Sequence, residues 1–328
     1  MTPGRVSEES WRPVAQLDAL RARAALLGRI RAFFARRGVM EVETPVASRA
    51  AATAPALHSL RVSLAGLGAE ARTLYLQTSP ELPMKRLLAA GSGPIFQICK
   101  VFRDGERGRL HHPEFSLLEW YRPGLGYRDL MVEVADLIRH ALDRPGLDAR
   151  YQSYRELFSE CLGLDPLTAD LEALHRAVHD IPGCRDLALD RDGCLDLLLT
   201  HHIELGLGRG HLDFIYDYPP SQAALACIRP DPVPVAERFE LYLEGMELAN
   251  GFQELTDPEE QRRRFAADLN KRASTGPDIG PVDAEFLAAL AAGIPETAGV
   301  ALGLDRLLMV ATGSSHIDEV LAFPVERA

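Results

Sequence analysis

The sequence predicts an α+β fold, in which an antiparallel sheet is flanked by helices and carries a helical insertion. Two stretches, residues 95–121 and 239–252, each show two strand-like segments joined by a loop or turn, as expected for antiparallel hairpins. Apolar residues recur at helical spacing from Leu17 to Phe34 and over much of residues 130–178. The hairpins predict the sheet, and the helical segments predict the layers that cover it.

Composition restricts the class of protein. The chain has 328 residues, and 36 Lys and Arg against 47 Asp and Glu give a net charge of −11. This acidity argues against sequence-independent binding of nucleic acid, without excluding a local basic cleft. The start of the chain lacks the apolar run of a secretory signal, and no stretch approaches the ~18 apolar residues of a membrane span. Five cysteines without a Cys-x-x-Cys pair fit reduced thiols. We therefore expect a cytoplasmic protein without a membrane segment.

Three parts of the chain are distinguished by their patterns. Residues 1–16 are polar and are expected to form a loose N-terminal arm. Residues 17–328 then form one domain. Within it, residues from about 151 to 210 carry successive helical patterns between strand-like segments, which predicts a helical insertion.

The domain begins with a helix that feeds a short strand. Gly38 follows the last helical turn, where glycine is typical of a C-terminal cap. Residues 40–44 alternate between apolar or small and acidic side chains until Pro45 ends the pattern. A long helix and a strand that stops at proline are the result.

A second strand and helix meet at a Ser-Pro-Glu sequence. Residues 51–71 are expected to be irregular, and residues 73–78 form a strand that leads into this sequence. Ser79 suits a helix N-cap, Pro80 the first helical position, and Glu81 the positive end of the helix dipole. The favourable interaction of its charge with the helix dipole is enough to explain Glu81 at this position. Contact with a ligand is the alternative interpretation.

The first hairpin combines a cationic loop with a mixed strand face. Its loop carries five basic or imidazole side chains, namely Arg103, Arg107, Arg109, His111 and His112. On the second strand, the period of two places one set of residues on one face, namely Phe115, Leu117, Glu119 and Tyr121. A ring, a carboxylate and a phenol beside a guanidinium suit a nucleotide and its phosphates. Taken alone, the stretch is equally compatible with a basic hairpin tip over ordinary packing.

The second hairpin brings two carboxylates together. If Glu244-Gly245 is a two-residue turn, Glu240 and Glu247 fall on the same side of the hairpin. Two such carboxylates repel unless a cation separates them, and Mg²⁺ carrying substrate phosphates is the natural candidate. Strict alternation puts Asn250 and Glu254 on the other side, unless a bulge at Gly251 re-aims them. An exposed acidic edge is the alternative interpretation.

The last informative stretch is residues 299–309. Small residues alternate with Val and Leu from Gly299 to Gly303, which allows another group to approach the strand closely. Arg306 falls in the first turn of the helix that follows, where a cation opposes the helix dipole at a cost of up to ~1 kcal/mol. An anion nearby is therefore expected. Asp305 would offset the charge in part, and a phosphate would do so better.

Together these stretches resemble the three motifs of class II aminoacyl-tRNA synthetases, and within that class the lysyl subgroup. The helix and strand up to Pro45 resemble the first motif, residues 102–121 the second and residues 299–309 the third. Four further segments narrow the resemblance to the elongation factor P β-lysine ligases, which are truncated paralogues of lysyl-tRNA synthetase: residues 78–86, 111–115, 118–123 and 247–257. The resemblance covers about residues 14–328 and implies the class II catalytic core.

The resemblance implies an ATP-dependent ligase. Such an enzyme activates (R)-β-lysine, or lysine, as an aminoacyl-adenylate and transfers it to the ε-amine of one lysine of elongation factor P. Only 16 residues precede the first-motif helix, so we expect no anticodon-binding domain and no tRNA acceptor. The first motif implies a homodimer. The alternatives are a free-standing lysyl-tRNA-synthetase-like activating enzyme and a non-catalytic regulatory paralogue.

The resemblance also assigns roles to individual positions. Arg103 would hold the α-phosphate and Arg306 the γ-phosphate as the catalytic pair, and Phe115 would stack on adenine. The other ATP contacts would be Asp104, Gly105, Glu106, His112, Glu247, Leu248 and Gly303. The amino-acid pocket would consist of Ser79, Pro80, Glu81, Tyr121, Asn250, Glu254 and Ala301. Glu240 and Glu247 would hold Mg²⁺.

Two departures from the family pattern concern this assignment. The family commonly has Arg-Asn-Glu where this chain has Arg103-Asp104-Gly105-Glu106, so Glu106 is a candidate to replace the missing carboxylate. His112 stands where the family has asparagine. At Ala301 the lysyl synthetases have glycine, whereas the ligases resemble this chain, and the methyl group would select an amino group displaced by one carbon.

Overall fold

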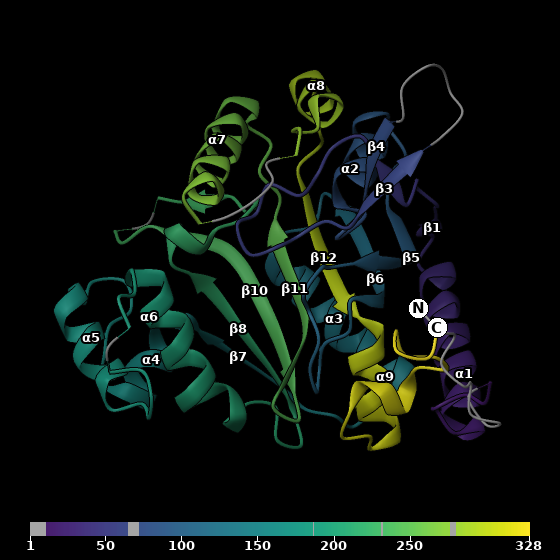
Figure 1. The fold of residues 1–328 in the computed structure, drawn as a ribbon, viewed down its shortest axis with the longest axis horizontal. Coiled ribbons are helices and arrows are strands. Elements are labelled where there is room, and N and C mark those ends of the chain that lie inside the picture. The colour runs from purple at the N-terminus through teal and green to yellow at the C-terminus, as the bar shows by residue number, and fades with distance from the viewer. Residues whose placement is uncertain (1–10, 65–71, 186, 231, 276–279) are drawn as a thin grey trace, which may run out of the picture.

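The computed structural model describes residues 11–64, 72–185, 187–230, 232–275 and 280–328. In this part of the chain, a nine-stranded sheet runs through the middle of the molecule with helices around it (Figure 1). Its order is β1-β5-β6-β12-β11-β10-β8-β7, and β9 pairs with β10. The strands are β1 (Met40–Glu41), β5 (Ile95–Phe102), β6 (Glu114–Pro123), β7 (Ala149–Ser153), β8 (Leu212–Tyr218), β9 (Ile228–Arg229), β10 (Val235–Leu243), β11 (Met246–Gln253) and β12 (Thr297–Gly303).

The predicted α+β class is confirmed, and the sheet is antiparallel at its centre. Both edges add a parallel pair, because β1 runs parallel to β5 and β7 runs parallel to β8. The helices are α1 (Leu17–Arg36), α2 (Glu81–Ala89), α3 (Tyr127–Leu142), α4 (Tyr154–Leu162), α5 (Leu171–His179), α6 (Arg191–Leu198), α7 (Pro258–Thr275), α8 (Ala284–Ala292) and α9 (Leu304–Thr312). A π-helical turn (Leu199–Ile203) and 3₁₀ turns at 204–206, 220–222 and 317–320 complete the helical segments. Within the described ranges, no helix has both the length and the apolar composition needed to cross a bilayer.

One face of the sheet is covered by α1, α3 and α9, which bury the main core. The strands contribute alternate residues to it, such as Leu118 and Trp120 of β6 and Val300 and Leu302 of β12. The predicted alternation of β6 is therefore confirmed. The other face carries the second set of β6 side chains, including Glu119 and Tyr121, and it borders a cavity.

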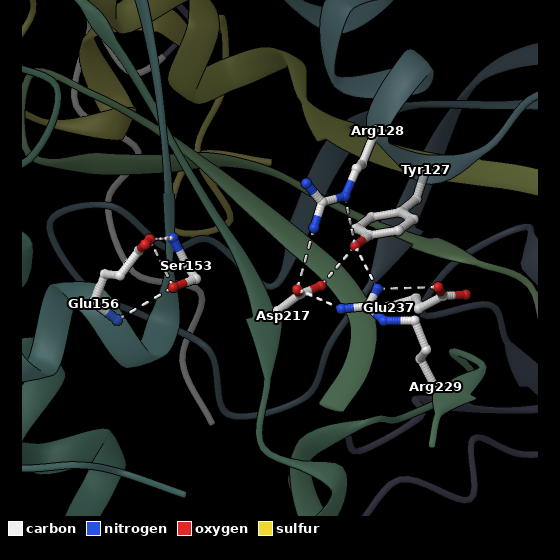
Figure 2. Close-up of polar contacts among 7 residues, drawn as sticks. All are labelled: Tyr127, Arg128, Ser153, Glu156, Asp217, Arg229 and Glu237. Atoms are coloured by element: carbon white, nitrogen blue, oxygen red, sulfur yellow. Dashed lines mark hydrogen bonds and ion pairs between the residues drawn. The ribbon is translucent and has the colours of Figure 1, made fainter. Parts of the chain in front are cut away.

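The segment predicted as a helical insertion builds a second core. Helices α4, α5 and α6 lie beside β7 and β8, on the side of the sheet away from α1 (Figure 1). Their apolar side chains pack on Tyr218 and Tyr242, which project from the sheet. A capping box starts α4: Ser153 accepts from the backbone N–H of Glu156, and the Glu156 carboxylate accepts from Ser153 (Figure 2).

A polar network ties α3 to the strands next to this insertion (Figure 2). The Tyr127 hydroxyl donates to Asp217 at 2.6 Å, and Arg128 and Arg229 reach the same carboxylate at 3.3 and 2.7 Å. Arg229 also pairs with Glu237 at 3.2 Å. Asp217 has a left-handed backbone with φ of +59°, which costs a non-glycine residue free energy. The network fixes this residue where the pairing between β8 and β10 shifts register.

Three local predictions need correction. Residues 51–71 were expected to be irregular, but β3 (Arg61–Leu64) lies among them and joins β4 (Arg72–Leu76) and β2 (Ala47–Ser48) in a small sheet. Arg61 and Ser63 alternate with Val62 and Leu64, so the period of two of a strand was present in the sequence, but all four residues are exposed and no buried apolar face marked the strand.

The helix after the Ser-Pro-Glu sequence begins one residue later than predicted. Pro80 occupies the N-cap position of α2 and Glu81 is the first helical residue. Ser79 still accepts a bond from the Glu81 backbone N–H at 3.0 Å, but its hydroxyl hydrogen goes to Glu119. The serine therefore belongs to the sheet face as much as to the helix.

The expected loose arm, residues 1–16, falls largely outside the described residues, which begin at Trp11. In the described portion, the backbone N–H groups of Val14 and Ala15 donate to Ala322 and Leu321 at 2.8 and 3.2 Å. Residues 14 and 15 are thus tied to the C-terminal segment, a long-range pairing that a local pattern does not reveal.

Candidate active site

A cavity of about 660 Å³ lies on the sheet face opposite α1, α3 and α9. This volume is within the range of ~300–1,000 Å³ that is usual for small-molecule sites. Of the residues predicted for the site, those that line the cavity are Ser79, Glu81, Arg103, Glu106, His112, Phe115, Tyr121, Glu247, Leu248, Asn250, Glu254, Ala301, Gly303 and Arg306. Arg103 and Arg306, which lie far apart in sequence, therefore share one cavity.

Four predicted residues, Pro80, Asp104, Gly105 and Glu240, are not among the lining residues. Pro80 is buried at the start of α2, and Asp104 and Gly105 are exposed at the loop tip. Gly105 has φ of +79°, so the chain turns back there and Asp104 points its backbone N–H to the carbonyl of His58 at 2.8 Å. Glu240 lies beneath the cavity wall, in a polar cluster described below.

One end of the cavity holds the arginine of the first hairpin. The Arg103 guanidinium lies 5.0 Å from the centre of the Phe115 ring, and its Nη1 is 3.7 Å from Glu106 Oε1. Its Nε donates to the carbonyl of Thr78 at 3.4 Å. Half-buried and weakly paired, this guanidinium can turn toward an anionic ligand. Glu106 lies where a carboxylate of the loop was expected.

The second arginine is held from several sides. Arg306 Nη1 donates to the carbonyl of Glu247 at 2.7 Å, and its Nη2 is 2.8 Å from Nε2 of His111. Burial and the charge of Arg306 lower the pKa of His111, so the imidazole is neutral and accepts from the guanidinium. Asp305 does not offset Arg306, because its carboxylate accepts from the backbone N–H of Ser116 and pairs with Arg23.

The other end of the cavity is an acidic cluster around one buried ammonium. Lys85 Nζ lies 2.5 Å from both Glu81 Oε1 and Glu254 Oε2, and only 1% of the lysine side chain is exposed. Glu119 accepts from the hydroxyls of Ser79 and Tyr121, each at 2.6 Å. We call Glu81, Lys85, Glu119 and Glu254 the acidic cluster. It contains three carboxylates and one ammonium.

The charges of the acidic cluster are not balanced within the described protein. Burial and the charge of Glu81 raise the pKa of Glu119 to about 7. Burial, with the charges of Glu81 and Glu119, raises the pKa of Glu254 to about 8, although Lys85 acts against this. Burial works against the charge of Lys85, yet Glu254 and Glu81 raise its pKa above the usual value. Among the described residues, Oε1 of Glu254 has no hydrogen-bond partner. A buried carboxylate oxygen without a partner fits a site for a cationic group of a ligand.

Gly299 of β12 makes room for this cluster. A Cβ added there would lie 2.2 Å from Glu254 Oε1 and 2.4 Å from the ring of Tyr121. Neither neighbour can move away easily, since both are buried. The small residues of the predicted 299–303 strand therefore serve the close approach that their pattern indicated.

The second hairpin places its polar residues as follows. The turn at Glu244-Gly245 is confirmed, with Tyr242 opposite Glu247. A bulge exists, but it lies at Leu248 and not at Gly251, because Leu241 pairs with Ala249 directly after. The extra residue brings Asn250 to the side of Glu247. Gly251 has another role, since an added Cβ would meet the ring of Phe239 at 2.5 Å.

Glu240 and Glu247 lie in neighbouring environments. Glu247 lines the cavity, and burial and the charge of Glu240 raise the pKa of Glu247. The hydroxyls of Tyr218 and Tyr242 each donate to Glu240 at 2.7 Å, and Arg238 pairs with it. Two mutually repelling carboxylates, one of them open to the cavity, fit the donor chemistry of Mg²⁺. Glu247 is the more accessible of the two.

The site roles assigned from the sequence did not include Lys85, Glu119, His111 or Arg238, although Glu119 and His111 lie in the first hairpin, whose pattern suited a nucleotide. Lys85 had a signal, since it lies four residues after Glu81 on one helix and such a pair is adjacent on the helix surface. Glu119 shares its strand face with Phe115 and Tyr121, so the same alternation that selected these residues also marks it. Arg238, whose Nε donates to Asn250 Oδ1 at 3.1 Å, had no such signal.

Comparison with known proteins identifies close relatives. A family model described as "tRNA synthetases class II (D, K and N)" matches residues 10–327. A protein of Pectobacterium atrosepticum is 48% identical over 323 residues, which is 97% of this chain and 98% of the relative. A protein of Salmonella gallinarum is 49% identical over the same shares. Both relatives bear the name elongation factor P–(R)-β-lysine ligase.

Proposed function

Because this chain belongs to the family of class II tRNA synthetases of the D, K and N type, we propose that it activates (R)-β-lysine and transfers it to a lysine of elongation factor P. The chain is a ligase and, as a member of this family, uses ATP. One observation carries the choice of a diamino acid. The cavity joins two arginines to a buried cluster with three carboxylates and one ammonium. That arrangement complements a molecule with phosphates at one end and two ammonium groups at the other.

The proposed reaction has two steps. The amino-acid carboxylate attacks the α-phosphorus of ATP, forming the aminoacyl-adenylate and releasing pyrophosphate. The neutral ε-amine of the acceptor lysine then attacks the acyl carbon, the new amide loses a proton, and AMP leaves. Arg103 would bridge carboxylate and α-phosphate through its two-pronged guanidinium. Arg306 would hold the γ-phosphate, so positioning and charge stabilisation replace a covalent nucleophile.

The remaining predicted residues are proposed to contact either the nucleotide or the amino acid in the same cavity. Phe115 would stack on adenine, with Glu106, His112, Leu248 and Gly303 around the nucleotide. Ser79, Tyr121, Asn250, Glu254 and Ala301 would surround the amino acid. For Pro80, Asp104 and Gly105, which do not line the cavity, any contact would come through the adjoining backbone.

We propose that Glu247, with Glu240 behind it, holds a Mg²⁺ ion, which when bound would neutralise charge on the ATP phosphates. Glu247 lines the cavity, with its Oε2 3.4 Å from Arg306 Nη1, whereas Oε2 of Glu240 accepts from both tyrosines and its Oε1 pairs with Arg238. In Glu247→Gln, half-maximal pyrophosphate exchange should require at least ~10-fold more Mg²⁺, as lost carboxylate ligands weaken divalent sites. An unchanged Mg²⁺ requirement would remove Glu247 from the site.

We also propose that the chain forms a homodimer, as the resemblance of its first motif implies. Light scattering at micromolar protein should give twice the mass of one chain. A single-chain mass under these conditions would contradict the proposal.

The function is tested by supplying the acceptor. The protein is incubated with ATP, Mg²⁺, (R)-β-lysine and purified elongation factor P, and the factor is then analysed by mass spectrometry. One β-lysyl addition on one lysine is expected, and a factor whose acceptor lysine is replaced by arginine serves as control. An unmodified factor beside charged tRNA would favour the activating enzyme of the synthetase type. Absence of pyrophosphate exchange with both lysine and β-lysine would favour a binding protein.

The acidic cluster predicts a pH dependence for amino-acid binding. Ammonium groups bind to ionised carboxylates, and the pKa values of Glu119 and Glu254 are raised to about 7 and about 8. The ionised carboxylates that bind ammonium groups are therefore present when the pH is above these pKa values, and they are lost as the pH falls through them. The kcat/KM for the amino acid should fall steeply below about pH 7, with apparent pKa values that belong to the coupled pair. The kcat/KM for ATP at saturating amino acid serves as the control, and it should not follow this profile.

A further inference from the structure

Lys85 is the buried cation of the acidic cluster, whose other polar groups are carboxylates and the hydroxyls bound to them. It projects from α2 and is 1% exposed. Its ammonium lies between Glu81 on the same helix and Glu254 after β11, at 2.5 Å from each. Tyr121, Cys99 and Cys227 are titratable groups in electrostatic contact with the cluster, and burial raises the pKa of each, so they stay neutral. The described protein therefore supplies one positive charge to three carboxylates.

The position of Lys85 decides which carboxylate oxygens are left for a ligand. It takes one oxygen of Glu81 and Oε2 of Glu254. Oε1 of Glu254 keeps no hydrogen-bond partner in the described chain, and Glu119 is bound only by two hydroxyls. When all four groups are ionised, the cluster carries two uncompensated negative charges. Two ammonium groups of a ligand would neutralise it.

We propose that Lys85 is a specificity-determining residue that acts as a built-in counter-ion, so that the pocket selects amino acids bearing two ammonium groups. This inference rests on the proposed function. Lys85 does not contact the reacting atoms. It holds Glu81 and Glu254 in place and leaves two negative charges for the substrate, because three unscreened carboxylates in one buried site would take up protons instead.

Replacement of Lys85 by alanine tests the counter-ion directly. The variant lacks the charge and a three-carbon chain, and n-propylammonium has the size and charge of the missing part. In amino-acid-dependent pyrophosphate exchange, the KM for lysine should rise ~100-fold, the scale expected when a buried pair loses one partner. The KM for ATP should stay within about twofold, since Lys85 pairs with Glu81 and Glu254 whereas Arg103 and Arg306 are held by other partners.

Addition of n-propylammonium should restore most of the exchange activity of Lys85→Ala, whereas n-propanol, of the same size without charge, should not. Capture of the adenylate by the added amine would lower exchange, so it cannot imitate this rescue. Calorimetry should show that the preference for lysine over norleucine, which has one ammonium group, falls at least ~10-fold in the variant, equivalent to ~1.4 kcal/mol. Addition of n-propylammonium should restore the preference of the variant for lysine over norleucine.

Lys100→Ala is the matched control, because it makes the same substitution on β5 at an exposed lysine that pairs with Glu114 and does not line the cavity. It should change neither the KM for lysine nor the preference. If Lys85→Ala does not fold, Lys85→Met keeps the volume without the charge and should show the same rise in KM. The inference is overturned if Lys85→Met retains the wild-type KM and preference, or if propanol rescues Lys85→Ala as well as propylammonium does. Wild-type protein that exchanges with no diamino acid would instead overturn the proposed function.

Discussion

Arg103→Ala is expected to lower amino-acid-dependent pyrophosphate exchange by about a thousandfold, the scale on which single charge-stabilising groups act in phosphoryl chemistry. Arg103 lies against Phe115 in the cavity and is bound only weakly by Glu106 and Thr78. It is therefore free to bridge the carboxylate and the α-phosphate of bound substrates. The loss should fall mainly on kcat, because the bridging interaction strengthens as the two groups approach. Steady-state exchange kinetics measure both constants.

The loop that carries Arg103 also provides its control. Arg107 pairs with Asp318 at 2.7 Å and Glu326 at 2.8 Å and does not line the cavity. Arg107→Ala should keep exchange within about twofold, as expected for exposed ion pairs. Arg103→Lys should keep the charge but lose the two-pronged geometry, with an intermediate loss. Exchange by Arg103→Ala at a rate within tenfold of wild type would show that Arg103 does not hold the reacting groups.

Glu254→Gln should raise the KM for the amino acid by more than about a hundredfold and leave the KM for ATP nearly unchanged, as removal of one partner of a buried charge pair costs ~3–5 kcal/mol. Glu254 is 2% exposed, contacts Lys85 at 2.5 Å and keeps Oε1 without a hydrogen-bond partner in the described residues. Glutamine keeps the shape and removes the charge that a substrate ammonium would meet. Exchange measured over a range of amino-acid concentrations gives the KM.

Glu285→Gln, the same substitution on exposed α8, is the matched control and should be neutral. Thermal unfolding distinguishes a binding effect from a folding effect, because Glu254→Gln also weakens the environment of Lys85. A variant that melts like the wild type and still binds the amino acid with unchanged KM would place the substrate ammonium groups elsewhere.

Local sequence patterns predicted those parts of the site that depend on neighbours along the chain. The period of two placed Phe115, Glu119 and Tyr121 on one face of β6. The structure confirms this, because these residues line the cavity whereas Leu118 and Trp120 of the other face lie in the main core. The Glu244-Gly245 turn also depends only on neighbouring residues. Both residues adopt positive φ there, as a two-residue hairpin turn requires. Resemblance to a family added the shared cavity of Arg103 and Arg306, which no local pattern contains.

Other features followed from contacts between distant segments. The bulge at Leu248 was predicted at Gly251, because glycine marks both bulges and close packing, and here Gly251 accommodates the ring of Phe239. Asp305 was expected to offset Arg306, but Arg23 and Ser116 engage its carboxylate. In each case a partner remote in sequence decided the outcome.

Patterns of consecutive residues were therefore enough to predict the α+β class, the hairpins, the faces of their strands and the family. The distribution of charges in the pocket, by contrast, follows from the packing of distant segments. Glu81, Glu119 and Glu254 come from three separate segments, and their pKa values and the burial of Lys85 depend on how far water is excluded when these segments meet. Burial and electrostatic coupling are properties of the packed chain, because both depend on distances in space, whereas a strand face or a turn depends on a few consecutive residues.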